Sequence, residues 1–336
     1  MRFVKRNKRS KELPLEGELV TSSSESLKIS SRSPDDPTRQ SGVETETNTS
    51  ESKQTWPGLL ESADKVRIPI KAREKVGYSS EEIQSFPDMF LDELNIEEGK
   101  AILASIRGDL KRHQGFLRQD SAIIETVSLG LSAKYVLLIV ADGVGSKRDS
   151  HLASRAAVIA ASNEFRALDS LNVDTWQISA KKIFQAAVLG IEAVASEKSL
   201  RSEDLLTTLT VVALELTQTS ERTLFQASVG NCRVLKIEEN NLQEVNAEVN
   251  LDLLANTKTR ALPLNISEIS ATVEKIGCDA ILCLLSDGAF EVWGQGLDFV
   301  SLLKSDDLES HKLAWALDVR SAGRVDDRTL AMWRPW

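Results

Sequence analysis

The chain has 336 residues, of which 41% are hydrophobic and 27% charged, a balance typical of a protein with a sizeable folded core. Its formal net charge of −9 argues against a dedicated nucleic-acid binder. Three cysteines are too few for a disulfide framework, and no apolar run approaches the about 18 residues that a membrane span needs. We therefore expect a soluble, cytoplasmic protein without a membrane span, whose oligomeric state the sequence leaves open.

Composition divides the chain into three predicted parts. Residues 1–55 combine a basic start with a stretch rich in Ser and Thr, and such a segment buries too little apolar surface to fold, so we expect a disordered tail. Residues 56–100 are intermediate in composition. The sequence SSEEIQ at 79–84 indicates a helix start there, so we interpret this part as an arm before the main domain. Residues 101–336 form the predicted main domain.

The main domain alternates predicted strands with helices. Aliphatic and β-branched runs predict strands over 121–127, 134–141, 207–216, 223–229, 233–237, 280–285 and 329–333. Apolar residues at helical spacing predict helices over 150–168 and 176–196. A turn at Gly230-Asn231 is expected to join strand 223–229 to strand 233–237. This order predicts an α+β layered domain and not a regular βαβ repeat.

Four aspartates lie at the ends of predicted strands. Asp142 and Asp287 each follow a strand, and Asp120 and Asp326 each precede one. Each aspartate alone is a common turn residue. Together they can converge on one edge of a sheet, where they repel one another unless cations neutralise them. Oxygen ligands without Cys or His select Mg²⁺ or Mn²⁺, and two such ions can hold a hydroxide and clamp a phosphoryl group.

Five motifs surround these aspartates in a fixed order along the chain. They are QDSA at 119–122, VADGVGS at 140–146, TTLTVVA at 207–213 followed by ASVGNCR at 227–233, LLSDG at 284–288, and VDDRTL at 325–330. The set resembles the metal-dependent protein phosphatases of type 2C, most closely their bacterial branch, over about residues 105–336. The resemblance implies a β-sandwich of two central antiparallel sheets flanked by helices, with the metals at one end.

The resemblance also implies a role for each aspartate. Asp142 would bridge two Mg²⁺ or Mn²⁺ ions, and the Gly143 carbonyl would ligate one of them. The other ion would be held by Asp287 and Asp326, with Asp120 acting close to the metals, partly through water. The implied reaction is hydrolysis of phosphoserine or phosphothreonine in a phosphorylated protein by metal-activated hydroxide, without a phosphoenzyme.

The sequence departs from the family pattern at three positions. Gln119 stands where many relatives have Glu, and Asn231 stands where relatives often carry Asp, which puts a third metal in doubt. Gly115 occupies the usual position of a phosphate-binding arginine, so Arg112 and Arg118 are the neighbouring candidates for that contact. These departures leave open a catalytically silent phosphatase fold that acts as a binding or regulatory module, and a hydrolase of small phosphoesters.

Overall fold

The computed structural model describes residues 79–336 apart from 131–132, 218, 246–258, 294–298 and 319–325. The chain divides into two units, Met1–Gln54 and Thr55–Trp336, and every described residue belongs to the second. The predicted tail over 1–55 and residues 56–78 of the predicted arm lie outside the described residues.

The described residues form eleven strands and seven α-helices. The strands are β1 (Met89–Ile96), β2 (Gly99–Ile106), β3 (Ser121–Leu129), β4 (Ala133–Ala141), β5 (Leu209–Glu215), β6 (Glu221–Val229), β7 (Arg233–Glu238), β8 (Asn241–Glu244), β9 (Ser270–Gly277), β10 (Ile281–Leu285) and β11 (Arg328–Pro335). The helices are α2 (Ser80–Ser85), α3 (Asp109–Gln114), α4 (Ser150–Arg166), α5 (Trp176–Glu197), α6 (Asp287–Trp293), α7 (Phe299–Lys304) and α8 (Ser310–Leu317).

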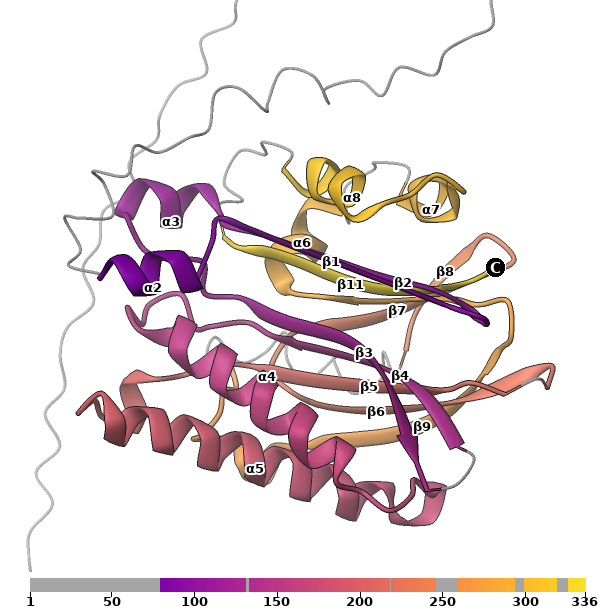
Figure 1. The fold of residues 1–336 in the computed structure, drawn as a ribbon, viewed down its shortest axis with the longest axis horizontal. Helices are drawn as coiled ribbons and strands as arrows, with labels where there is room; N and C mark the ends of the chain where they lie inside the picture. The colour runs from indigo at the N-terminus through magenta and orange to yellow at the C-terminus, as the bar shows by residue number, and fades with distance from the viewer. Residues whose placement is uncertain (1–78, 131–132, 218, 246–258, 294–298, 319–325) are drawn as a thin grey trace, which may run out of the picture. The chain divides into compact units, whose positions relative to one another are not determined.

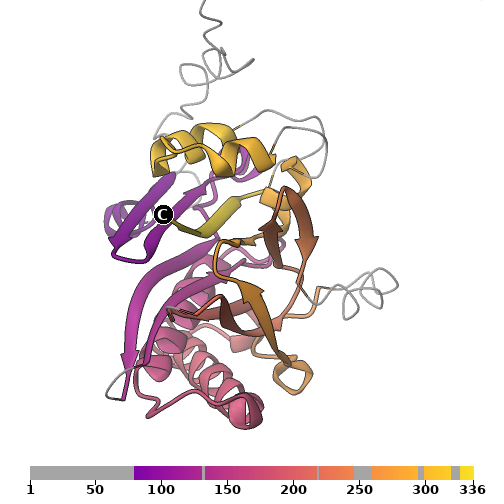
Figure 2. The ribbon, with the colours of Figure 1, turned by 90° about the vertical axis from the view of Figure 1, so that its right-hand side faces the viewer.

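The strands make two antiparallel sheets. One has six strands in the order β1-β2-β11-β10-β7-β8, and the other has five in the order β3-β4-β5-β6-β9. The sheets stack on each other, with α4 and α5 outside the five-stranded sheet and α6, α7 and α8 outside the six-stranded sheet (Figures 1 and 2). This arrangement confirms the predicted β-sandwich flanked by helices.

Three apolar cores hold these layers together. One lies between the five-stranded sheet and helices α4 and α5, one between the six-stranded sheet and helices α6 to α8, and one between the two sheets. Strand β4 contributes to two of them, because Leu137 and Ile139 face the helices while Val136 and Leu138 face the other sheet. Burial on both faces explains why this strand is continuously aliphatic instead of alternating.

Residues Gly230-Asn231 join strand β6 to strand β7, as predicted, but the two strands lie in different sheets. Strand β6 pairs with β5 and β9, whereas β7 pairs with β10 and β8 in the other sheet. The chain therefore crosses between the sheets here and makes no hairpin. Gly230 has a φ of 116°, a conformation that side chains other than glycine rarely adopt.

Residues 89–100, which belong to the predicted arm by composition, are strands of the sandwich. They form β1 and the start of β2, and β2 pairs with β11 along its full length. Strand β1 is an edge strand in which Asp92, Glu93 and Asn95 interrupt the apolar pattern. Such polar residues are common at sheet edges, and here they masked the strand in the sequence.

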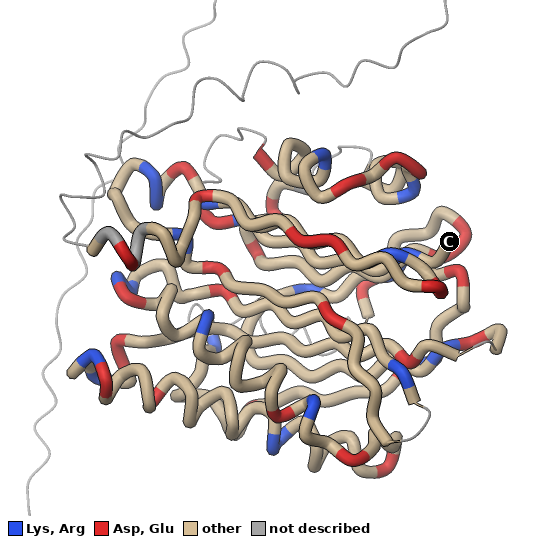
Figure 3. Tube along the Cα trace, viewed as in Figure 1, with Lys and Arg blue, Asp and Glu red and all other residues tan. Residues whose placement is uncertain are grey.

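Acidic and basic residues are interspersed over the sheets and helices of the described chain (Figure 3).

Of the helices that the structure describes, none has the length and hydropathy that crossing a bilayer requires. Cys232, Cys278 and Cys283 are free thiols.

Candidate active site

Two of the predicted acids lie at one end of the five-stranded sheet. Strands β3 and β4 pair in a register that sets Ser121 opposite Ala141. Asp120 precedes Ser121 and Asp142 follows Ala141, so the two aspartates leave neighbouring strands at the same end. The pairing of the strands, which follows from their aliphatic sequences, therefore brings together two residues that are 22 positions apart in the chain.

The other two acids are placed in the same way by the six-stranded sheet. Strands β10 and β11 pair with Leu285 opposite Leu330. Asp287 is the first residue of α6, just after β10, and Asp326 lies two positions before β11. Both aspartates therefore reach the same end of this sheet.

A threonine hydroxyl from the six-stranded sheet binds an acid of the five-stranded sheet. Thr329 of β11 donates a hydrogen bond from Oγ1 to Oδ2 of Asp120 across a distance of 2.7 Å. The pKa of Asp142 is raised by burial and then by the charges of Asp120 and Asp287, with Asp326 contributing as well. The structure thus brings the four predicted aspartates within electrostatic range of one another.

The threonines of the third motif hold Asp142 in place. The Thr208 N–H and the Thr207 hydroxyl both donate to the Asp142 carbonyl, at 2.8 and 3.0 Å, and the Asp142 N–H donates to Thr208 Oγ1 at 3.0 Å. A Cβ at Gly143 would lie 2.8 Å from the Gln119 carbonyl oxygen, so only glycine fits between these segments. The first three motifs therefore pack directly against one another.

Asp120 is the most deeply buried of the four acids. Its side chain is inaccessible to solvent, and no described residue donates a hydrogen bond to its Oδ1. Burial, followed by the charges of Asp327 and Asp326, raises the pKa of Asp120 to about 8. A buried carboxylate oxygen without a donor favours a proton or a cation beside it.

The donor chemistry of this end of the sandwich fits a hard divalent cation. Asp120 and Asp142 offer carboxylate oxygens and have raised pKa values. All four predicted side-chain ligands are aspartates, and carboxylate oxygens are the ligands that such cations prefer. Within the described residues, however, no three His, Cys, Asp or Glu side chains are already arranged as a metal-binding group. The acids are close together without forming a closed cage.

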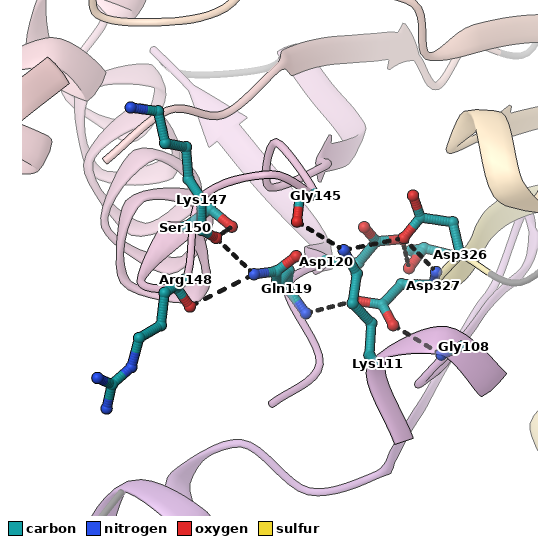
Figure 4. A network of polar contacts seen from close by, with 11 residues as sticks. Gly108, Lys111, Gln119, Asp120, Gly145, Lys147, Arg148, Ser150, Asp326 and Asp327 are labelled. Carbon is teal, nitrogen blue, oxygen red and sulfur yellow. Dashed lines mark hydrogen bonds and ion pairs between the residues drawn. The ribbon is translucent and has the colours of Figure 1, made fainter. Parts of the chain in front are cut away.

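Asp287 and Asp326 lie nearer to solvent and have protein partners. Asn231 donates from Nδ2 to Oδ2 of Asp287 at 2.7 Å. The ammonium of Lys111, on helix α3, lies 3.4 Å from Oδ1 of Asp326 and donates to the Gly145 carbonyl at 3.3 Å (Figure 4). The Asp326 side chain is 45% exposed, whereas that of Lys111 is 2% exposed. A buried ammonium therefore stands at the edge of the acidic cluster.

The two arginines predicted to contact phosphate are both occupied by the protein. Arg112 donates hydrogen bonds from Nη1 to Asp109 and Asp318. Arg118 donates from Nη1 to the Asp120 carbonyl and to Ser105 Oγ. Gly115 ends α3 with a φ of 74°, a left-handed conformation that would be unfavourable for an arginine at this position.

Sequence reasoning missed two residues of this site, Lys111 and Asp327. Asp327 is 2% exposed and accepts hydrogen bonds from the backbone N–H groups of Gly108 and Gln119. Burial, and then the charge of Asp326, raises its pKa. In the sequence, Lys111 resembles a solvated lysine on a polar helix. Asp327 stands directly beside Asp326 in the same motif, and only Asp326 was assigned a role. The only available signal was the adjacency of Asp327 to a strand-end acid.

Comparison with known proteins identifies the family. A sequence profile described as protein phosphatase 2C matches residues 107–318, which is more than half of the chain. A search of curated proteins gave no match.

Solved structures show a similar fold. The serine/threonine phosphatase Stp1 from Staphylococcus aureus is 17% identical with a TM-score of 0.51, and the match covers 72% of this chain and 98% of that one. The catalytic domain of the serine threonine protein phosphatase PstP, in complex with two manganese ions, is 20% identical with a TM-score of 0.45, covering 74% of this chain and 99% of that one. The phosphatase MsPP from Mycobacterium smegmatis, in complex with cacodylate, is 18% identical with a TM-score of 0.46, covering 70% and 97%.

The profile match, together with the two-sheet sandwich and its four strand-end aspartates, shows that this chain belongs to the protein phosphatase 2C family.

Proposed function

We propose that this chain is a cytoplasmic serine/threonine protein phosphatase that hydrolyses phosphoserine or phosphothreonine in a phosphorylated protein with the help of Mg²⁺ or Mn²⁺. The observation that carries the proposal is the convergence of four aspartates from two sheets, one of which, Asp120, has a buried oxygen that accepts no hydrogen bond from a described residue. Membership of the protein phosphatase 2C family supports the same reaction.

The four aspartates and the Gly143 carbonyl are the groups that would hold the cations, with two ions per site. When bound, the ions supply a nucleophile from water and neutralise charge on the phosphoryl group. Thr207 and Thr208 fix the backbone of Asp142 and therefore the direction from which this carboxylate meets a cation. Thr329 orients the carboxylate of Asp120, because its hydroxyl is bonded to Oδ2 and leaves Oδ1 for a cation.

Lys111 is the cation best placed to contact the phosphate of a substrate. An ammonium has three N–H donors, and the contacts of Lys111 with Asp326 and Gly145 are long, at 3.4 and 3.3 Å. Because its side chain is almost fully buried, a phosphate would reach the ammonium from the side of the half-exposed Asp326. Arg112 and Arg118 are less suitable, since carboxylates and backbone or hydroxyl oxygens already bind them.

Phosphate release from a phosphothreonine peptide tests the proposal. The assay compares Mn²⁺ with EDTA, and the wild type with Asp287→Asn and with Asp307→Asn as a matched control. Asp307 is an exposed carboxylate between α7 and α8 that pairs with Lys312, away from the four acids in the fold. We expect release that requires Mn²⁺, vanishes in Asp287→Asn and persists in Asp307→Asn. Failure of the folded wild type on both a phosphothreonine and a phosphoserine peptide, with Mn²⁺ and with Mg²⁺, contradicts the proposal.

A catalytically silent module is the second candidate function. The absence of a ready three-ligand metal group in the described residues favours it, as does the Asn231 amide that occupies an oxygen of Asp287. Thermal stabilisation by millimolar Mn²⁺ separates the two, because a silent module gains little from the metal. Turnover of p-nitrophenyl phosphate without turnover of either peptide would instead identify a hydrolase of small phosphoesters.

A further inference from the structure

Both carboxylate oxygens of Asp327 accept backbone hydrogen bonds at the acidic end of the sandwich. Its Oδ1 accepts the Gly108 N–H at 2.7 Å and its Oδ2 accepts the Gln119 N–H at 2.5 Å (Figure 4). The two donors lie more than 200 residues before it in the chain. Both oxygens of this buried carboxylate therefore accept hydrogen bonds from the backbone of a segment that is distant in sequence.

Each of these contacts lies next to a residue of the proposed site. Gly108 precedes helix α3, which carries Lys111, and Gln119 precedes Asp120. A Cβ added to Gly288 would lie 2.1 Å from the Asp327 carbonyl oxygen, so the backbone after Asp287 packs directly on Asp327.

Gln119 extends these contacts to the loop after Asp142. Its Nε2 donates to the Lys147 carbonyl at 2.7 Å and to the Arg148 carbonyl at 3.4 Å (Figure 4). Its backbone carbonyl accepts the Ser154 hydroxyl at 2.6 Å. Only an amide can make the two side-chain donations, because a carboxylate has no N–H group. The Gln119 side chain thus fastens the loop to the first acidic motif, and the Gln119 backbone carbonyl fastens helix α4 to it.

We propose that Asp327 is a positioning residue which, through its contacts with Gly108, Gln119 and Gly288, sets the positions of the four aspartates and of Lys111 relative to one another. The inference rests on the proposed phosphatase function and adds a residue that holds the acids without itself binding metal or substrate. Asp327 is suited to this role and not to metal binding, because each of its oxygens already accepts a short backbone hydrogen bond. Asparagine cannot replace it fully, since the amide nitrogen of asparagine donates and does not accept.

The test compares Asp327→Asn with the wild type and with Asp307→Asn in three measurements. They are amide hydrogen exchange at Gly108 and Gln119, the Mn²⁺ dissociation constant by calorimetry, and kcat and KM for a phosphopeptide. In Asp327→Asn we expect exchange to be about fivefold faster or more at one or both of these amides, because one carboxylate acceptor is lost. We expect Mn²⁺ affinity to fall about tenfold, the usual effect of removing a group that orients metal ligands.

Gln119→Met provides a second variant of nearly the same volume. It removes the side-chain hydrogen bonds to the Lys147 and Arg148 carbonyls. The hydrogen bond from the backbone N–H of residue 119 to Asp327 is retained. We expect weaker Mn²⁺ binding and faster exchange in residues 143–150, with normal exchange at Gly108. This variant keeps the inference testable if Asp327→Asn does not fold.

The outcomes separate this inference from the proposed function. Unchanged exchange at both amides in Asp327→Asn, or faster exchange with unchanged Mn²⁺ affinity, overturns the positioning role even if the enzyme is active. A wild type that binds no Mn²⁺ and releases no phosphate overturns the function, and with it the role of Asp327 in holding a metal site. Loss of both protection and affinity in the two variants, against normal values in Asp307→Asn, supports the inference.

Discussion

The carboxylates of Asp120 and Asp326 lie at the same end of the sandwich and differ in what surrounds them. Asp120 is inaccessible to solvent and has one oxygen without a donor among the described residues, whereas the Asp326 side chain is 45% exposed and lies beside the Lys111 ammonium. Asp142 resembles Asp120 in its raised pKa, and Asp287 resembles Asp326 in having a polar partner, Asn231. The molecule therefore has inner acids and outer acids.

This difference shows that environment, and not residue type, assigns a role to each acid. The inner acids, Asp120 and Asp142, depend on a proton or a cation because burial disfavours their charge. The outer acids, Asp287 and Asp326, already have protein partners and lie nearer to solvent. We expect substitution of an acid to abolish the reaction, and substitution of Asn231 or Lys111, the partners of the outer acids, to tune it.

The largest effect is expected from Asp142→Asn. The substitution keeps the size of the side chain but removes the charge that would neutralise the cations, so kcat should fall by about 1000-fold or more while the fold is retained. Steady-state turnover and circular dichroism measure the two quantities, with Asp307→Asn as the control. Turnover like that of the wild type would sink the assignment of Asp142 to the metals.

A smaller effect is expected from Lys111→Met, which preserves the apolar stem and removes the ammonium. If Lys111 binds the substrate phosphate, KM for a phosphopeptide should rise about tenfold, corresponding to the loss of one charge-assisted hydrogen bond. Mn²⁺ affinity should change far less, because the inner acids remain. The matched control is Lys147→Met, since Lys147 pairs with Asp204 away from Asp326. A changed metal affinity with an unchanged KM would contradict the phosphate contact.

The smallest effect is a pH dependence of thermal stability. The pKa of Asp120 is raised from 3.8 to about 8 by burial and neighbouring charges. Between these pH values the native chain keeps a proton that the unfolded chain has released, so stability in EDTA should decrease as the pH rises through this range. A bound cation replaces the proton, and Mn²⁺ should therefore raise Tm by more degrees at about pH 8 than at about pH 6.

Melting curves with Mn²⁺ and with EDTA at both pH values measure this difference. Asp120→Asn serves as the control. Because this variant lacks the titrating carboxyl, its Tm in EDTA should change less between the two pH values than that of the wild type. An equal or smaller Mn²⁺ shift at the higher pH contradicts the assignment of Asp120 as an inner acid that exchanges a proton for a cation.

Much of the fold was predictable because its central strands are buried on both faces. The run KYVLLIVA predicted β4 almost to the residue, and the apolar stripes predicted α4 and α5. Strand β1 was missed because it lies at a sheet edge and carries polar residues. The jump between sheets at Gly230 was missed because a turn sequence does not specify which strand follows in space.

The candidate site was predictable only where local chemistry marks it. The four aspartates stand out because each adjoins a strand end, a pattern that is visible along the chain. The burial of Lys111 depends on Gly145 and Asp326, and the role of Asp327 depends on Gly108 and Gln119. These contacts join segments up to about 219 positions apart, so no local pattern reveals them.

Strand β11 is the last strand in the described chain, yet it lies between β2 and β10 in the middle of its sheet. Among the described strands, the hairpin of β1 and β2 joins the rest of that sheet only through β11. Within that pairing, Arg328 lies opposite Ile106, so the paired residues are separated by most of the sequence. Such distant pairings form late, because a long loop must close first. During synthesis, a chain that has not yet delivered residues 326–335 lacks Asp326, Asp327 and the strand that aligns them, so the four aspartates cannot come together on the ribosome before the sandwich closes.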